Sequence, residues 1–261
     1  MAALVKTAVS AALLLLLFAG CGSSSPQGFA FDPRQTSAAT QLGVPVETTL
    51  ATPAGVKIQL ALIPAGTFTP RPRKDQPDTT VTIEKPFYMS RHEITQAQYA
   101  IVMDTNPSTF AAADSPVEQM KWADAVAFCT KLSEQSGKRV RLPTEMEWEY
   151  ACRAGSSGAY YAGTGDNILD QLAWFKGNCD KTHPVGKKAP NAWGLYDTLG
   201  NVAEWCADVI PAARDGEESI RVSRGGSWLD EPVACRTGSR ALAPESFKTS
   251  KIGFRILVEL K

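Results

Sequence analysis

Histidine is scarce in this 261-residue chain, which contains only His92 and His183. They lie 91 positions apart, and neither forms part of an HExxH metalloprotease motif. The chain also lacks the glycine-rich GxxxxGK[ST] loop of nucleotide hydrolases and the GxSxG turn of serine hydrolases. We therefore expect both histidines to be ordinary surface or core residues rather than catalytic groups or metal ligands.

An excess of positive charge is also missing. The chain has 27 Lys and Arg against 27 Asp and Glu, so its formal net charge is zero. A nucleic-acid-binding domain usually carries a basic face, and a polybasic membrane contact needs clustered Lys and Arg. The composition argues against both, and we predict no nucleic-acid partner.

Long apolar runs are absent except near the N-terminus. Ala8 to Phe18 form an apolar segment of 11 residues, which is too short to span a bilayer as a helix. The following "FAGCGSSS" is typical of a bacterial lipoprotein signal, with Cys21 as the lipid-accepting residue, although ordinary secretion is the alternative. We predict a signal peptide at 1–20, a flexible Ser- and Thr-rich tether at 21–43, and one domain at 44–261, held at the cell envelope through lipid on Cys21 and facing the periplasm or the exterior.

Paired cysteine motifs are absent as well. No CxxC occurs, which disfavours a zinc ribbon or a thioredoxin-type site. After Cys21 the chain has five cysteines: Cys129, Cys152, Cys179, Cys206 and Cys235. An extracytoplasmic compartment permits disulfides, but an odd number leaves at least one thiol free. The sequence does not determine the fate of Cys129, Cys179 or Cys206.

The regular patterns that are present indicate a mixed α+β domain. Alternating apolar residues predict strands at 56–68, 80–83, 87–94, 221–228 and 253–259. Helices are predicted to begin after Thr95 and Thr144, each of which is followed three residues later by Gln or Glu in a capping box, and a third is predicted from Trp122 to Gly137. Regular signals are sparse from Gly155 to Gly226, and so long a loop is typical of a functional or ion-stabilised region.

Several phrases, in this order, resemble one family. They are "LIPAGTF", "PFYMSRHEITQAQY", "RLPTEMEWEYACRAG", "GLYDTLGNVAEW", "RGGSW", "ACRTGSR" and "IGFRI". Together they resemble the sulfatase-modifying-factor domain over residues 56–260. The resemblance implies the formylglycine-generating-enzyme fold, which is distantly similar to C-type lectins, has little regular secondary structure and binds calcium.

The resemblance also implies where a catalytic site would lie. In the active enzymes two cysteines after the Gly-Gly-Ser segment hold copper(I), because thiolates are soft ligands. Here Asp230 stands at the first of these positions, and a carboxylate is a hard ligand, so we expect no copper site. If the chain were an active oxidase, Ser227 and Cys235 would be the candidate catalytic residues.

Cys235 has a second interpretation within the same resemblance. Alignment from Arg240 and "IGFR" makes it the cysteine of a "CRxxxR" pattern, and the implied partner is Cys152 of "EYACRAG". We therefore predict a Cys152–Cys235 disulfide. Two unpaired core thiols, or a functional thiol, are the alternatives.

The phrase "GLYDTLGNVAEW" is the predicted calcium site. By resemblance, Asp197 supplies a side-chain oxygen, Thr198, Gly200 and Val202 supply carbonyls, and Glu204 lies close by. The alternative is that this segment only forms a hydrogen-bonded turn. A second calcium site of the family would use Asn178, but its acidic partner segment is missing from this sequence.

Two functions remain open at this point. The missing cysteine at Asp230 favours a lipid-anchored domain that binds or assembles with another envelope protein and has no copper oxidase activity. The alternative is a formylglycine-generating or related oxidoreductase that acts on the cysteine of a sulfatase-type polypeptide.

Overall fold

The computed structural model describes residues 30–71, 79–212, 214 and 217–260. The predicted signal peptide and Cys21 lie outside the described residues. Within the described part of the chain, none of the helices has the length and apolar character needed to cross a bilayer.

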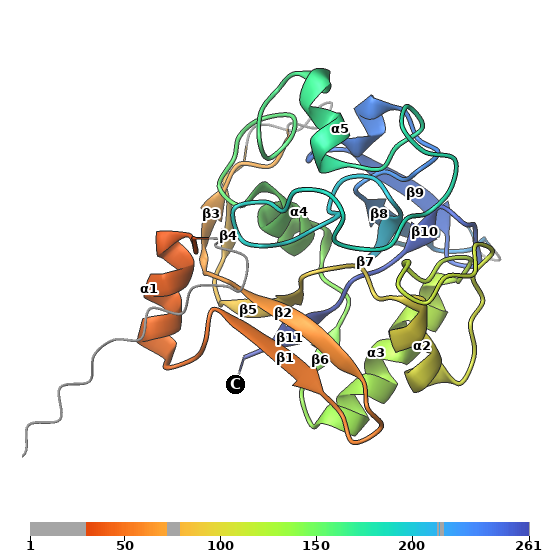
Figure 1. Cartoon of the computed structure of the whole chain (residues 1–261), viewed down its shortest axis with the longest axis horizontal. Helices are drawn as coiled ribbons and strands as arrows, with labels where there is room; N and C mark the ends of the chain where they lie inside the picture. The colour runs from red at the N-terminus through yellow and green to blue at the C-terminus, as the bar shows by residue number, and fades with distance from the viewer. Residues whose placement is uncertain (1–29, 72–78, 213, 215–216, 261) are drawn as a thin grey trace, which may run out of the picture. The chain divides into compact units, whose positions relative to one another are not determined.

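A five-stranded sheet forms one part of the domain, with the strand order β1-β2-β5-β11-β6 (Figure 1). All of its pairings are antiparallel, and the C-terminal β11 lies between β5 and β6. The strands are β1 (Glu47–Ala51), β2 (Lys57–Ile63), β5 (Phe87–Ser90), β6 (Val140–Arg141) and β11 (Leu257–Glu259). A separate hairpin joins β3 (Gly66–Phe68) to β4 (Val81–Ile83).

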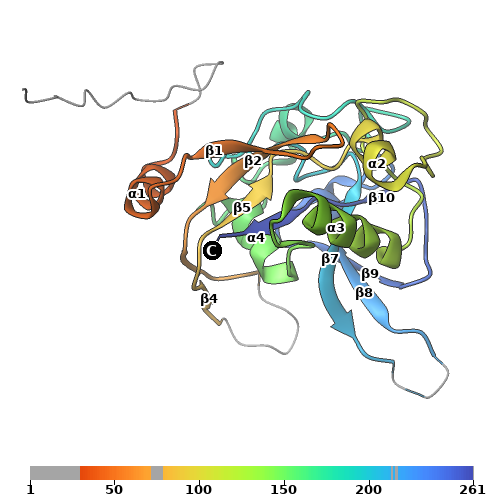
Figure 2. The same ribbon diagram turned by 90° about the horizontal axis from the view of Figure 1, so that it is seen from below.

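A second sheet has the order β10-β7-β8-β9, and Figure 2 shows β7, β8 and β9 side by side. Its strands are β7 (Ala203–Ile210), β8 (Ile220–Arg224), β9 (Arg240–Pro244) and β10 (Ile252–Gly253). The predicted strand at 253–259 is therefore two short strands in two different sheets. Residues 254–256 connect these strands, and the connection carries the fully buried Arg255.

Two helices begin directly after the residues that the capping-box patterns predict. Thr95 and Thr144 each accept a backbone N–H three residues on, which confirms both capping boxes. The helices are α1 (Pro33–Leu42), α2 (Gln96–Met103), α3 (Trp122–Ser136), α4 (Glu145–Arg153) and α5 (Leu169–Leu172), with 3-10 turns at Asp166–Ile168 and Pro232–Cys235. The buried residues of α3, the helix predicted from Trp122 to Gly137, are Ala125, Phe128, Cys129 and Leu132.

Helix α1 corrects the prediction of a flexible tether for residues 33–43, while residues 21–29 of that segment lie outside the described residues. Asp32 caps its first turn, Pro33 stands at the first helical position, and Gly43 ends it in the left-handed conformation. Gln35 of α1 is fully buried and donates to the carbonyls of Leu62 and Trp193. The segment has few apolar residues, which is typical of a tether. The buried Gln35 amide nevertheless attaches the helix to the domain, and the caps at its two ends stabilise the helix itself.

In the long stretch between α4 and β8, the described residues form a 3-10 turn, α5 and β7 and are otherwise irregular, in agreement with the sparse sequence signals. This stretch is nevertheless well packed, since Trp193, Leu195, Leu199 and Val202 are each at most 1% exposed. The α+β architecture predicted from the sequence is therefore confirmed.

Candidate functional site

The turn from Asp197 to Glu204 is held in a conformation that few residues adopt. Asp197, Gly200 and Asn201 all have positive φ, at 52°, 75° and 56°. Gly200 packs directly against the backbone of Trp174, whose carbonyl accepts the Asn201 N–H at 2.7 Å. A side chain at position 200 would meet that carbonyl, so glycine is required there.

Glu204, which follows the turn, binds a fully buried arginine. Both of its carboxylate oxygens accept from Arg255, at 2.6 Å each, and Oε2 also accepts from the Trp148 indole N–H at 2.6 Å. Arg255 donates in addition to the carbonyls of Ser90 and Tyr196. This guanidinium therefore joins β7, the strand β5 and the loop before the turn.

Two further carboxylates lie beside this pair. Glu93 is 1% exposed and accepts from the side chain of Asn201 and the backbone N–H of Val202, at 2.9 and 3.1 Å. Burial, followed by the charges of Asp197 and Glu204, raises the pKa of Glu93 well above its usual value. Burial likewise raises the pKa of Asp197 to about 6. Three buried carboxyl groups thus surround one guanidinium, which favours either proton uptake or a bound cation.

The predicted calcium ligands fit an ion only in part. Asp197 Oδ2 accepts the Gly186 N–H at 2.6 Å, while Oδ1 is buried and has no hydrogen-bond partner among the described residues. That orphaned oxygen and the turn carbonyls suit a hard cation. Glu204, by contrast, is already committed to Arg255 and Trp148. No cluster of three or more His, Cys, Asp or Glu side chains in the described chain could hold a metal, so an ion here would depend on backbone oxygens.

Asn178, which the resemblance implies for a second calcium site, makes local hydrogen bonds. Its side-chain oxygen accepts the Phe175 N–H, and its amide donates to Asp170 and to the carbonyl of Ala173. These bonds use the side chain to stabilise a turn.

Asp230 is held by an ion pair. Its carboxylate accepts one hydrogen bond from the Ser227 hydroxyl at 2.6 Å and another from the ammonium group of Lys251 at 3.1 Å. Ser227 is fully buried. The position at which the resemblance implies a copper-binding cysteine is therefore occupied by a charge-neutralised carboxylate.

The structure contradicts the predicted Cys152–Cys235 disulfide, because both residues are free thiols. They belong to one apolar cluster, yet they face different groups. Cys152 Sγ lies 3.9 Å from the Thr198 carbonyl, whereas the Cys235 sulfur faces the backbone of Gly200 and Ser227. The two sulfurs thus lie against different backbone groups of the same turn.

Of the three alternatives for these cysteines, the structure shows two unpaired core thiols. Cys235 is 0% exposed, and burial raises its pKa to about 12, with the charge of Asp230 adding to the shift. Such a thiol stays protonated near neutral pH and is a poor nucleophile and a poor metal ligand. Cys129 and Cys206 are also free and buried, and Cys179 is free and partly exposed.

A groove of about 280 Å³ lies beside Asp230, between β9, β10 and the Pro232–Cys235 turn. Asp230, Lys251 and Arg240 contribute charge to its wall, and Leu242 and Phe247 contribute apolar surface. Leu242 and Phe247 are 49% and 43% exposed, and Leu229 and Val233 of the neighbouring segment are 46% and 54% exposed. The groove wall therefore carries two large exposed apolar side chains, Leu242 and Phe247, and we refer to these two residues with the groove as the apolar rim.

The two histidines do not converge on this region or on each other. His92 stacks on Tyr196, and burial, followed by the charges of Arg255 and Arg91, lowers its pKa to about 3. His183 stacks on Trp174 with ring centroids 3.8 Å apart. Sequence reasoning missed Glu93, Lys251 and Arg255 as site residues, although "RHEIT" and "IGFR" contain two of them.

Comparison with known proteins places these features in context. Residues 49–260 match the family described as "Sulfatase-modifying factor enzyme 1-like domain". Chaperone protein LppX of Paenibacillus barcinonensis is 28% identical over 225 residues, which cover 67% of this chain and 80% of that protein. The formylglycine-generating enzyme of Bos taurus is 33% identical over 168 residues, covering 54% of this chain but only 43% of the enzyme. The match thus leaves more than half of the bovine enzyme without a counterpart.

A solved structure agrees with the fold. Treponema denticola variable protein 1 superposes with a TM-score of 0.74 and 28% sequence identity, and the superposition covers 82% of this chain and 99% of that one. The fold over most of this chain is therefore shared with a known protein.

Proposed function

The chain belongs to the sulfatase-modifying factor enzyme 1-like family, and we propose that it is an envelope protein that binds a polypeptide partner and has no copper-dependent oxidase activity. The observation that carries this proposal is the Asp230–Lys251 ion pair at the position of the first copper ligand. A carboxylate that is already neutralised by an ammonium group offers little to a soft cation.

The neighbouring thiols support the same conclusion. Linear copper(I) coordination in a family oxidase needs two thiolates that face each other. Cys235 is buried and protonated, and it lies against backbone groups of Gly200 and Ser227. Loading this site with copper would require both exposure of Cys235 and loss of the Asp230–Lys251 pair.

The apolar rim supports polypeptide binding. An extended peptide can place alternate side chains against Leu242 and Phe247 while its backbone lies along β9, the edge strand of the second sheet. Asp230, Lys251 and Arg240 add charges of both signs for polar side chains. The relative from Paenibacillus barcinonensis is named a chaperone protein, and a chaperone is a polypeptide-binding protein.

The envelope part of the proposal rests on the N-terminal sequence. An apolar segment followed by "AGC" motivates lipid attachment at Cys21. An acylated chain terminus would hold the domain at a membrane surface, where its partner would be another envelope protein or a sulfatase-type polypeptide.

Site-specific photo-cross-linking tests the binding surface. A photoreactive amino acid at Leu242 should give a discrete cross-linked product with a polypeptide in the native host. The same group at Ile101 of α2, which is similarly exposed at 43%, serves as the control. A product at both positions, or at neither, would contradict a specific role for the apolar rim.

A bound calcium ion is a second element of the proposal, because Asp197 Oδ1 is buried and has no hydrogen-bond partner among the described residues. A ligand that binds only the native state stabilises it by RT ln(1 + [L]/Kd), about 2.7 kcal/mol at a hundredfold excess over Kd. Chelation should therefore lower the melting temperature by several degrees, and Asp197→Ala should remove that difference. A wild-type melting curve that is the same in calcium and in excess chelator would exclude a stabilising ion.

A further inference from the structure

A second pocket, of about 430 Å³, lies where three loops meet. Arg71 lies in the loop after β3, Arg153 is the last residue of α4, and Arg236 follows Cys235, and all three line the wall. Thr69 and Ser157 also line it. Among the described residues that line this pocket, three carry a guanidinium and none carries a carboxylate.

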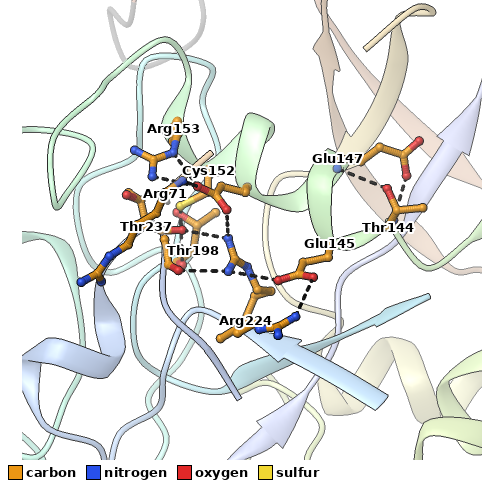
Figure 3. A network of polar contacts seen from close by, with 12 residues as sticks. Arg71, Thr144, Glu145, Glu147, Cys152, Arg153, Thr198, Arg224 and Thr237 are labelled. Carbon is orange, nitrogen blue, oxygen red and sulfur yellow. Dashed lines mark hydrogen bonds and ion pairs between the residues drawn. The ribbon is translucent and has the colours of Figure 1, made fainter. Parts of the chain in front are cut away.

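The carboxylate of Glu149, which lies beside these arginines, is already fully used. Glu149 Oε1 accepts from Arg153 Nε and Nη2, at 2.8 and 2.7 Å, and from the Arg71 backbone N–H at 3.1 Å. Its Oε2 accepts from the buried Arg224. Glu149 thus pairs with Arg153 and shares Arg224 with Glu145. Within the described part of the chain, its carboxylate makes no bond to the guanidinium of Arg71, which Figure 3 shows pointing away from this network.

Arg71 is held in place by a close packing contact. A Cβ atom at Gly238 would lie 2.5 Å from Arg71 Cβ and 2.7 Å from its Cδ, so the stem of Arg71 rests on a residue that has no side chain. Thr237, next to Gly238, bonds through its hydroxyl to the carbonyls of Gly158 and Ala159. These contacts bring the loops after β3, α4 and Cys235 together and fix the positions of their arginines.

Arg236 has an unused donor. Its Nε is buried and has no hydrogen-bond partner among the described residues. The rest of the guanidinium lies beside the Tyr160 hydroxyl and Asp166, with Nη2 3.6 Å from a carboxylate oxygen of Asp166, whose side chain is 55% exposed. A buried N–H without an acceptor is unfavourable unless a ligand supplies one.

We propose that this pocket binds the oxyanion of a phosphate or sulfate ester through Arg71, Arg153 and Arg236. The guanidinium fork matches the paired oxygens of such groups, and prepositioned arginines lose little side-chain freedom on binding. The volume exceeds that of a bare oxyanion, and Thr69 and Ser157 provide hydroxyls for the rest of an ester. The proposal is independent of the apolar rim and of polypeptide binding there.

Calorimetric titration of the full domain with inorganic phosphate and with inorganic sulfate, at constant ionic strength set by chloride, tests the site. We expect saturable binding that Arg71→Gln and Arg236→Gln each weaken about tenfold, the loss expected for one charge-assisted hydrogen bond. Arg139→Gln, which removes a 78% exposed arginine outside the pocket, should leave it unchanged. Methyl phosphate and methyl sulfate as further titrants distinguish the two ester classes.

Gly238→Ala separates geometry from charge, because it keeps every arginine and displaces the stem of Arg71. We expect it to weaken oxyanion binding, measured below the melting temperature of the variant, and also to lower the thermal melt, because the added Cβ would lie 2.5 Å from Arg71 Cβ. The proposal is overturned if wild-type protein binds neither anion more tightly than chloride. It is also overturned if Arg139→Gln weakens binding as much as Arg71→Gln does.

Discussion

Arg255→Met should destabilise the fold by about 3–5 kcal/mol, the range found when one partner of a buried ion pair is removed. Arg255 is 0% exposed and donates to both oxygens of Glu204, which is itself 1% exposed. The substitution leaves Glu204 without its cation, next to Glu93 and Asp197. Urea denaturation monitored by tryptophan fluorescence measures the change in the free energy of unfolding.

The pH dependence of that loss has a definite sign. The charge of Arg255 lowers the pKa values of Glu93 and Asp197 in the folded wild type, so without the guanidinium both pKa values rise further. A carboxyl group whose pKa is higher in the folded than in the unfolded state loses stability as the pH rises from its unfolded to its folded pKa. The folded-state pKa of Asp197 is already about 6 in the wild type, so the gap in unfolding free energy between variant and wild type should widen as the pH rises above about 6, where this group ionises in the wild type but stays protonated in the variant.

Arg139→Met provides the matched control. Arg139 also pairs with a glutamate, Glu259, at 3.1 Å, but its side chain is 78% exposed. Exposed pairs contribute about 0–1 kcal/mol. Equal losses in the two variants would show that the buried pair does not organise the core as described.

Gly200→Ala should be the second severe substitution. A Cβ atom there would lie 2.2 Å from the Trp174 carbonyl oxygen and 3.0 Å from Ala173 Cβ, and φ is +75°. Left-handed strain costs about 1–2 kcal/mol and overpacking about 1–3 kcal/mol. Together they predict a loss of at least about 2 kcal/mol in the free energy of unfolding, measured by the same denaturation.

Gly137→Ala distinguishes the two contributions. Gly137 ends α3 with φ +65°, but a Cβ atom added there would meet no other atom of the described chain within 4 Å. The loss in the free energy of unfolding of this variant should therefore come from the left-handed backbone strain alone. If Gly200→Ala costs no more than Gly137→Ala, the close contact between the turn and Trp174 is not present in solution.

Local signals in the sequence predicted the fold well where they were strong. The capping boxes at Thr95 and Thr144 gave the starts of α2 and α4, because a cap is satisfied within one helical turn. Helix α1 was missed because its only deeply buried contacts come from Gln35 and Ala39, and so it lacks an apolar stripe. Propensity and periodicity do not report a buried amide that bonds to a distant carbonyl.

The candidate site was predicted only in the segment that carries a continuous motif. The turn at Asp197–Glu204 could be found from "GLYDTLGNVAEW", whereas its partners Glu93 and Arg255 are more than 50 residues away along the chain. The disulfide prediction was wrong for a similar reason. A shared apolar cluster brings Cys152 and Cys235 near each other, but the side-chain directions depend on the turn between them, which pairing rules do not describe.

The most direct test of the central claim is a single oxidation assay. Reduced protein is loaded anaerobically with copper(I) and then exposed to oxygen with a sulfatase-type peptide containing Cys-x-Pro-x-Arg, and the peptide mass is measured. Because Asp230 is paired with Lys251 and Cys235 is buried and protonated, we predict that the peptide cysteine is recovered unchanged. Conversion of that cysteine to formylglycine would contradict the account and establish the chain as an oxidase.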